Sequence, residues 1–288
     1  PYISKVDAGT IELVRSFGPE IVPSGDLIQS FEATWDDEQW QMHLEAATHT
    51  NAAFGVAWKF IADQVRANGS VEEMAVSDVI MDHFASNKMT TYHPPIVGLG
   101  PHSGNPHYDT GTGKNTSIRE GDFVLVDLWA KMDRPRAVYS DLTRTGFVGT
   151  EVPAKYTEIF NIVAASRDAA IACVRDAYDA DRPLQGWEVD DACRNVIEQA
   201  GYGEFYVHRT GHSIGQEVHG NGANMDNLET REDRLVMKQT CFSVEPGIYQ
   251  PEFGVRSEVD VFVDSEGQVH VTGGELQTEI VRILADFV

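Results

Sequence analysis

Apolar residues recur at helical spacing along several parts of the chain. The clearest pattern begins near Thr34 and ends near Asn68-Gly69, with steps of three, four and seven between Trp40, Leu44, Ala47, Phe54, Trp58, Ile61 and Val65. Acidic residues at 36–38 suit the positive end of a helix dipole. The spacing predicts a long amphipathic helix. Similar patterns predict helices at about 75–87, 153–180 and 188–200.

Strand-like segments lie between and after these helices, at about 123–130, 137–147, 240–249 and 254–263. Helices and strands come in runs rather than in regular alternation, which is typical of the α+β class. Residues 1–33 have a different character, because glycines and prolines break their short apolar runs. We therefore expect one main domain over 34–288, preceded by a strand or helix edge of an incomplete unit.

Two of the strand-like segments carry acids among apolar residues. Asp127 stands in the middle of an apolar run, and burying a carboxylate there is costly unless it is paired or coordinated. Asp141 follows fourteen residues later, after a turn at Arg134. A hairpin centred at Arg134 places Asp127 and Asp141 directly opposite each other, where like charges repel. We expect a positive group between them.

The same arrangement occurs a second time. Glu245 and Glu258 lie thirteen residues apart on two strand-like segments, with prolines and glycines between them. Strand alternation puts Arg256, Glu258 and Asp260 on one face and the neighbouring valines on the other. Two hairpin-like units that each contribute two acids suggest a pseudo-two-fold arrangement around one site.

Three of the ten histidines, His208, His212 and His219, fall within twelve residues among glycines. This density indicates a functional cluster. A lone histidine is more often structural, and this is how we interpret His43, His49, His83, His93 and His270.

Charge balance indicates how many ions such a site would hold. One divalent ion leaves two of the four acids uncompensated, whereas two ions balance all four. Oxygen-rich ligation with one imidazole suits Mn²⁺, Fe²⁺ or Co²⁺ better than a thiolate-type Zn²⁺ site. Two ions that share carboxylates can bridge a water and turn it into a hydroxide nucleophile. The alternative is that the acids are ordinary surface residues, which explains Asp133 or Asp260 well but Asp127 and Glu245 poorly.

Composition argues against several classes of function. The chain has 45 acidic residues against 22 Lys and Arg, a formal net charge of −23, which disfavours nucleic-acid and anionic-membrane partners. Cys173, Cys193 and Cys241 form neither a zinc pattern nor a disulfide framework, which favours the reducing cytoplasm. No stretch approaches the roughly 18 apolar residues of a membrane span, and no signal-peptide pattern is present.

Together these residues resemble a known family. Asp127, Asp141, His212, Glu245 and Glu258 occur in the order of the metal ligands of the pita-bread metallopeptidases, which include methionine aminopeptidase, aminopeptidase P and prolidase (Xaa-Pro dipeptidase). Three motifs over about residues 34–288 carry the resemblance: H-x-x-G-H-x-I-G-x-E-x-H, Glu-Pro-Gly-Ile-Tyr and Gly-Val-Arg-Ser-Glu. The resemblance implies a pita-bread (creatinase/aminopeptidase-like) fold, in which helices cover a curved antiparallel sheet.

The resemblance also implies a role for each ligand. Asp127 would chelate one ion, His212 and Glu245 would bind the other, and Asp141 and Glu258 would bridge the two. Glu245 would also handle the proton of the bridging water. Manganese is the first choice of metal, with cobalt, iron or zinc as alternatives.

Four further residues match family positions near the substrate. His107 falls where the family has a substrate-contacting histidine, His208 where one lines the pocket, and His219 where one assists the tetrahedral intermediate. At the position of Arg256 the sequence resembles prolidases and aminopeptidases P, and a guanidinium there could bind a peptide carboxylate. Its alternative role is an ion pair with Asp260.

By resemblance, the function is that of a two-metal exopeptidase hydrolysing the bond before proline in Xaa-Pro peptides through the metal-bridging hydroxide. Alternatives are an aminopeptidase P, a broader aminopeptidase, a non-peptidase hydrolase or lyase, or a non-catalytic binding module on this fold. The resemblance also makes residues 1–33 a linker or a remnant of an N-terminal creatinase/prolidase-like domain. Short proline-containing peptides are the expected partners, and a homodimer is consistent with the family.

Overall fold

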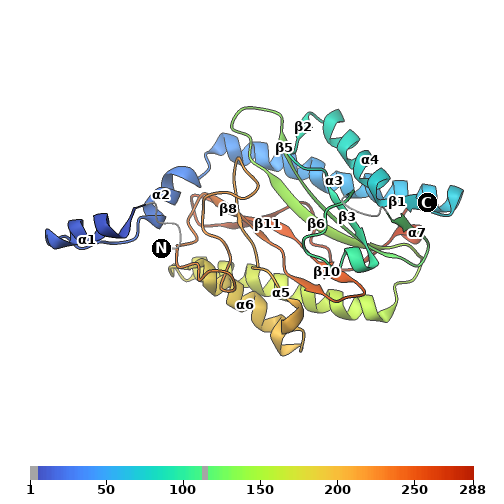
Figure 1. Cartoon of the computed structure of the whole chain (residues 1–288). Helices are drawn as coiled ribbons and strands as arrows, with labels where there is room; N and C mark the ends of the chain where they lie inside the picture. The colour runs from blue at the N-terminus through green and yellow to red at the C-terminus, as the bar shows by residue number, and fades with distance from the viewer. Residues whose placement is uncertain (1–5, 112–115) are drawn as a thin grey trace.

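Helices make up much of the computed structural model, which describes residues 6–111 and 116–288. They are α1 (Ala8–Ser16), α2 (Gly25–Glu32), α3 (Asp37–Asn68), α4 (Glu73–Ser86), α5 (Ala154–Asp179), α6 (Gly186–Gln199) and α7 (Ile283–Asp286), with 3-10 turns at Gly100–His102 and Gly203–Phe205. Figure 1 shows α3 and α4 along one side of the strands and α5 and α6 along the other. The four helices expected from the sequence are therefore confirmed.

The strands of the described residues are β1 (Val71–Glu72), β2 (Met89–Thr90), β3 (Ile96–Leu99), β4 (Ser117–Ile118), β5 (Phe123–Met132), β6 (Ser140–Phe147), β7 (Ser213–Ile214), β8 (Thr240–Val244), β9 (Gly247–Tyr249), β10 (Gly254–Arg256), β11 (Val259–Val263), β12 (Val269–Thr272) and β13 (Val281–Arg282). One sheet has the order β12-β11-β8-β7, and the other has the order β13-β6-β5-β2 with β3 also paired to β5. Strands β5 and β6 are antiparallel, as are β8 and β11.

Helix α3 begins three residues later than the sequence pattern indicated. Asp36 has an extended backbone, and its side chain accepts a hydrogen bond from the Gln39 backbone N–H. Gln39 returns a side-chain bond to the Asp36 backbone, which completes a capping box. At the other end Gly69 has a φ of 79°, a left-handed conformation that glycine adopts readily. The end of the helix is where the sequence placed it.

Two of the four expected strands are interrupted. The segment 240–249 divides into β8 and β9 around Glu245-Pro246, and the segment 254–263 divides into β10 and β11 around Ser257-Glu258. Proline has no backbone N–H for a ladder. The backbone N–H of Glu245 donates to the Thr210 carbonyl, and that of Glu258 donates to the Thr143 carbonyl. Both glutamates therefore lie at strand breaks. The bond of Glu245 continues the β7–β8 pairing, and that of Glu258 reaches the other sheet.

The expected pairing of Asp127 with Asp141 is wrong. The β5–β6 register places Asp127 opposite Thr143 and Asp141 opposite Trp129. The centre of the turn is displaced by one residue, which moves the register by two, and Arg136 in this loop adopts a left-handed φ of 65°. A shift of two keeps every side chain on its expected face. Asp127 and Asp141 remain on the same face as diagonal neighbours.

The two halves of the domain each have their own apolar core. In one, residues of α3 and α4 such as Trp58 and Ile80 pack with β5 and β6. In the other, residues of α5 and α6 such as Val163 and Val189 pack with β8, β10 and β11. Each half thus consists of a helix pair and an antiparallel strand pair. The repeated plan agrees with the pseudo-two-fold arrangement suggested by the acids.

Of the first 33 residues, those from 6 onward form two helices rather than a strand. No residue of α1 is buried, and α1 projects from the body of the molecule in Figure 1. Helix α2 is held to the body by the side chains of Asp26 and Gln29, which bond to the backbone of Leu235. No helix in the described ranges is long and apolar enough to cross a membrane. The assignment of 1–33 as a linker or a remnant of an N-terminal domain stays a prediction.

His43 of α3 is sealed inside the molecule. Its Nδ1 lies 2.8 Å from the Tyr139 carbonyl and its Nε2 lies 2.7 Å from the Thr272 hydroxyl. A carbonyl can only accept, so Nδ1 carries the hydrogen and Nε2 accepts from Thr272. Burial lowers the pKa of His43 to about 4, although the bond to Tyr139 opposes this shift. The structural interpretation of His43 is supported.

We expect this histidine to make the fold acid-sensitive. The unfolded state takes up the His43 proton near pH 6.5, whereas the folded state takes it up only near pH 4, so stability falls as the pH drops through this window. At ~1.4 kcal/mol per pKa unit, the loss between pH 7.5 and pH 5 is about 2 kcal/mol. Urea unfolding at both pH values should show a smaller loss for His43→Gln than for wild type. Equal losses would contradict the role of His43, and His49→Gln on the same helix is the control.

Candidate metal centre

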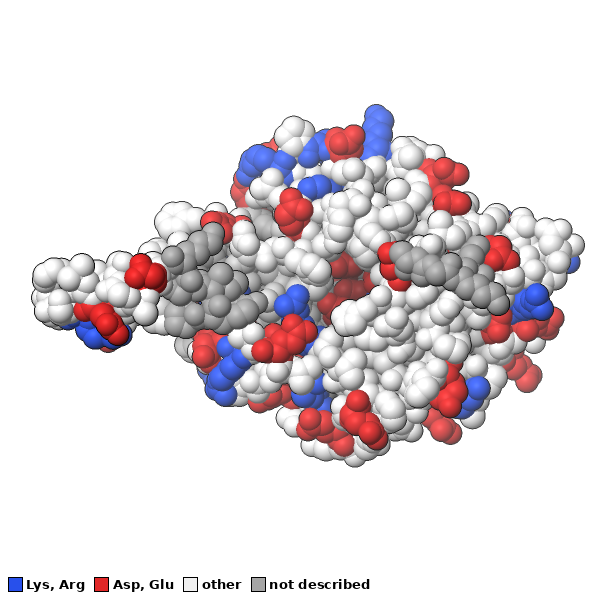
Figure 2. Space-filling model, in the orientation of Figure 1, with Lys and Arg blue, Asp and Glu red and all other residues white. Residues whose placement is uncertain are grey.

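Five potential ligands from both halves of the molecule meet between the sheets. Asp127 lies on β5, Asp141 on β6, His212 just before β7, Glu245 just after β8 and Glu258 just before β11. Acidic side chains gather at the bottom of a hollow in the middle of the face shown in Figure 2. All five residues predicted as ligands are therefore brought to one region.

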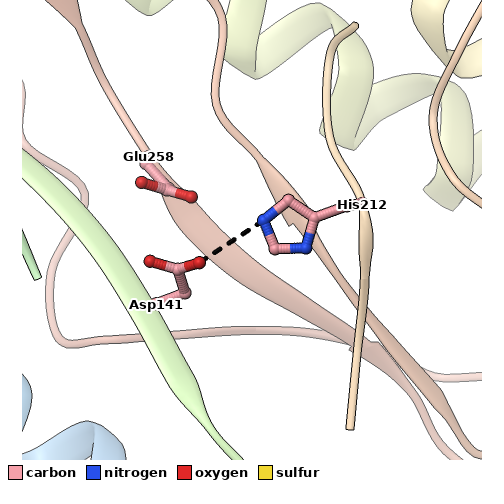
Figure 3. A group of neighbouring side chains, drawn as sticks. All are labelled: Asp141, His212 and Glu258. Atoms are coloured by element: carbon pink, nitrogen blue, oxygen red, sulfur yellow. Dashed lines mark ion pairs between the residues drawn. The ribbon is translucent and has the colours of Figure 1, made fainter. Parts of the chain in front are cut away.

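Asp141, His212 and Glu258 form the tightest part of this group. One ligand atom from each lies within 4.8 Å of the other two, and all three side chains are buried. Figure 3 shows them pointing toward a common centre from three separate segments. His212 Nε2 lies 3.4 Å from an oxygen of Asp141 and 3.4 Å from an oxygen of Glu245.

The orientation of His212 indicates what belongs at that centre. Its Nδ1 lies 3.2 Å from the Ser213 carbonyl, so Nδ1 carries the hydrogen in the neutral ring. Burial lowers the pKa of His212, which favours the neutral form. The lone pair of Nε2 then faces oxygens of Asp141 and Glu245. Lone pairs that converge in this way repel each other unless a cation lies between them.

The carboxyl groups show the same need for positive charge. Burial raises the pKa of Asp141 well above its ordinary value, and the charges of Asp127 and Glu245 raise it further. The pKa of Glu258 is raised by burial and then by Asp141 and Glu245. Burial also acts on Glu245, but the nearby His212 and His208 outweigh it and lower its pKa. Four acids with one imidazole form a donor set that fits hard or intermediate divalent ions.

Arg256 supplies one positive charge to the site, and its partner is Asp127. Its Nη2 forms a short ion pair with the Asp127 carboxylate, and its Nε donates to the Thr143 hydroxyl at 3.0 Å. Its Nη1 donates to the Tyr249 hydroxyl at 3.2 Å. The alternative pairing with Asp260 is not the one that the structure shows. These three contacts hold the guanidinium of Arg256 from three sides, and the residue is 6% exposed.

Thr143 and Tyr249 belong to the site although the sequence did not single them out. The Thr143 hydroxyl lies 3.1 Å from Asp127 Oδ1 and 2.6 Å from Glu258 Oε2, so it links ligands of the two halves. The Tyr249 hydroxyl lies 2.7 Å from His208 Nε2. A signal was available for Thr143, because it is two residues from Asp141 and so on the same strand face.

The three histidines expected near substrate occupy different positions. His219 is exposed, and its ring packs edge-on against that of His212 with centroids 4.4 Å apart. His208 Nδ1 lies 2.7 Å from the Arg209 carbonyl, which leaves Nε2 to accept from Tyr249. His107 is exposed on the loop after β3, and within the described residues its imidazole contacts none of the five ligands.

Known proteins share this sequence pattern and fold. The sequence model of metallopeptidase family M24 matches residues 41–265. The putative dipeptidase YkvY of Bacillus subtilis is 30% identical over 257 residues, which are 88% of this chain and 64% of that protein. An Xaa-Pro dipeptidase of Lactobacillus delbrueckii subsp. lactis is 35% identical over 194 residues, which are 66% of this chain and 48% of that protein. The chain thus spans less than two thirds of both relatives.

Solved structures extend the likeness to almost the whole chain. An Xaa-Pro dipeptidase from Bacillus anthracis superposes with a TM-score of 0.73 at 28% identity, covering 96% of this chain and 72% of that one. The dipeptidase PepE from Mycobacterium ulcerans gives a TM-score of 0.75 at 24% identity, covering 97% and 69%. The pita-bread fold expected from the sequence is confirmed.

We expect Asp127→Asn and Glu258→Gln to lose metal. Each keeps the size of the side chain but removes a negative charge from the proposed donor set, so affinity should fall by more than the ~10–100-fold typical of an outer-shell change. Titration of the metal-free protein with Mn²⁺ in a calorimeter measures this. Asp133→Asn, on an exposed part of the same hairpin, should bind like wild type. Two ions bound with wild-type affinity by either ligand variant would refute the assignment.

Proposed function

The chain belongs to metallopeptidase family M24, and we propose that it is a two-metal exopeptidase that hydrolyses the bond before proline in short Xaa-Pro peptides. The convergence of Asp141, His212 and Glu258 on one centre supports a bound ion, and the further acids Asp127 and Glu245 beside them support a second. The preference for proline is supported by relatives named Xaa-Pro dipeptidase. A homodimer and a cytoplasmic location remain predictions from the sequence.

We assign the ligands as the sequence suggested. Asp127 would serve one ion, His212 and Glu245 the other, and Asp141 and Glu258 both. When bound, two divalent ions would supply Lewis acidity toward the peptide carbonyl and an activated water, and oxygen-rich ligation favours manganese. Glu245 is suited to accept the proton of the attacking water, because its carboxylate lies at the centre, with one oxygen 3.4 Å from His212 Nε2.

His219 is placed to act on substrate rather than on metal. Its ring contacts His212 from the open side, and it also lines a cavity of about 490 Å³ together with Trp35, Gln39, Arg136 and Glu217. This cavity offers room for the part of a peptide beyond the scissile bond. We propose that His219 donates a hydrogen bond to the oxygen on which negative charge develops. His107 would contact substrate from the exposed loop.

His208 and Tyr249 support the guanidinium of Arg256. Because His208 Nε2 accepts from the Tyr249 hydroxyl, the hydroxyl oxygen is oriented to accept from Arg256 Nη1. Arg256 then has three partners and two remaining N–H groups. Those two groups are what it can offer to a peptide carboxylate while it holds Asp127.

A substrate panel tests the proposed function. With Mn²⁺ added, the protein should hydrolyse Ala-Pro much faster than Ala-Ala, chelation should abolish the activity, and renewed Mn²⁺ should restore it. Ala-Pro-Ala should be a poorer substrate if the chain is dipeptidase-like. Equal rates on Ala-Pro and Ala-Ala would indicate a broader aminopeptidase. Absence of hydrolysis by a protein that holds two ions would refute the peptidase proposal.

Arg256→Met separates two roles of the guanidinium. If it grips the carboxylate of a dipeptide, a charge-assisted bond of ~1.5–3 kcal/mol is lost and kcat/KM falls about ten- to a hundred-fold for Ala-Pro but far less for Ala-Pro-Ala. If its main task is to hold Asp127, both substrates lose equally and metal affinity falls as well. The buried ion pair favours a contribution from the second role, so we expect some loss on both substrates. Tyr249→Phe is the milder control, because it removes one partner and keeps the cation.

A further inference from the structure

Asp260 is a buried acid that the ligand assignment does not use. It lies on β11, is fully buried, and is two residues from Glu258. Its carboxyl oxygens lie 3.2 and 3.1 Å from the Asp141 backbone N–H nitrogen, and one of them lies 3.0 Å from the Ser140 hydroxyl. A side chain from one sheet therefore binds the backbone of a proposed ligand on the other.

The two sheets meet at a short seam between β6 and the segment that enters β11. At one position the seam is made by main chain, because the Glu258 N–H donates to the Thr143 carbonyl at 3.3 Å. Two residues before Thr143 and two residues after Glu258, Asp141 faces Asp260. At Asp260 strand β11 is paired on both edges, with Ser243 of β8 on one side and Thr272 of β12 on the other. Only the side chain of Asp260 is left to reach β6.

Within the residues that the structure describes, the Asp141 N–H has no strand partner on this side. Strand β6 pairs with β13 only at Gly146 and Phe147, at its far end. Asp141 is 4% exposed, and a buried N–H without an acceptor destabilises the fold. The carboxyl group of Asp260 fills this position. The seam thus has a main-chain bond at Glu258 and a side-chain bond at Asp141, which are the two residues assigned as shared ligands.

We propose that Asp260 is a positioning residue for the metal centre. Its carboxyl group takes the place of a main-chain hydrogen bond between the two sheets and fixes the backbone of Asp141 relative to Glu258. The inference rests on the proposed two-metal function. Helix α3 supports Asp260 from behind, where His43 Nε2 lies 3.8 Å from its carboxyl group, and Thr50 contacts Ser140 at 2.9 Å. Outer groups that orient a ligand in this way typically change metal affinity without binding the metal.

The test compares three variants in the full chain. Asp260→Leu removes both acceptors but keeps the branched arrangement of four side-chain heavy atoms, and we expect it to bind Co²⁺ about 10–100-fold more weakly and to alter the visible spectrum of the bound Co²⁺. Asp260→Asn keeps an oxygen for the Asp141 N–H, so it should recover most of the affinity and the spectrum. Thr272→Val is the matched control, because it removes the hydroxyl that contacts His43 in the same buried network and leaves Asp141 untouched.

Thermal unfolding of the metal-free proteins separates positioning from stability. Thr272→Val should lower Tm yet bind Co²⁺ like wild type, whereas Asp260→Leu should lose affinity at a temperature where it is fully folded. If Asp260→Leu does not fold, Asp260→Ser provides a hydroxyl that is too short to reach β6, and the same loss of affinity is expected.

Two outcomes would overturn the inference alone. Wild-type Co²⁺ affinity and spectrum in a folded Asp260→Leu or Asp260→Ser would show that Asp141 needs no such support. An equal loss in Thr272→Val would show a general effect of the network. A wild-type protein that binds no divalent ion at all would instead refute the proposed function, and this inference with it.

Discussion

Three buried carboxyl groups and the half-buried Glu245 lie within reach of one another, and the electrostatic cost of this arrangement governs the rest of the site. Burial and neighbouring negative charges raise the pKa of Asp141 and of Glu258 well above their ordinary values, and Asp141 is one of the charges that act on Glu258. Such a cluster is stable only with compensating positive charge. Arg256 provides part of that charge at Asp127, and the converging lone pairs around His212 mark where the remainder belongs. The apolar cores behind both sheets provide the rigidity that holds the acids together.

The backbone brings these acids together in two different ways. Asp127 and Asp141 sit inside regular strands, where alternation alone directs them to one face. Glu245 and Glu258 sit where strands end or begin. The backbone N–H of Glu245 bonds to Thr210 and continues the β7–β8 pairing, whereas that of Glu258 bonds to Thr143 of β6 in the other sheet. A bond that joins the two halves therefore also places the ligand Glu258.

The sequence predicted the parts of this arrangement that depend on local pattern. The long helix α3 follows from apolar spacing, and Asp127 was recognisable because a carboxylate stood in an apolar strand. The direct pairing of Asp127 with Asp141 failed because the centre of the turn lies one residue further along the chain, in a loop where Arg136 is left-handed, and no pattern of polarity reveals this. The sequence also could not identify the ion-pair partner of Arg256, since strand alternation allowed both Asp127 and Asp260 to face it. Thr143 and Asp260 act through contacts between sheets, and a single sequence does not encode such contacts locally.

Arg256 changes the charge balance on which the two-metal hypothesis was first built. The four acids alone require two divalent ions for neutrality, but the buried guanidinium leaves only three negative charges to compensate. Two divalent ions would then leave the site with a surplus of one positive unit, and a hydroxide nucleophile, with its single negative charge, would balance it. The ion pair with Asp127 therefore fits a centre that is neutral only when it also holds an anionic nucleophile.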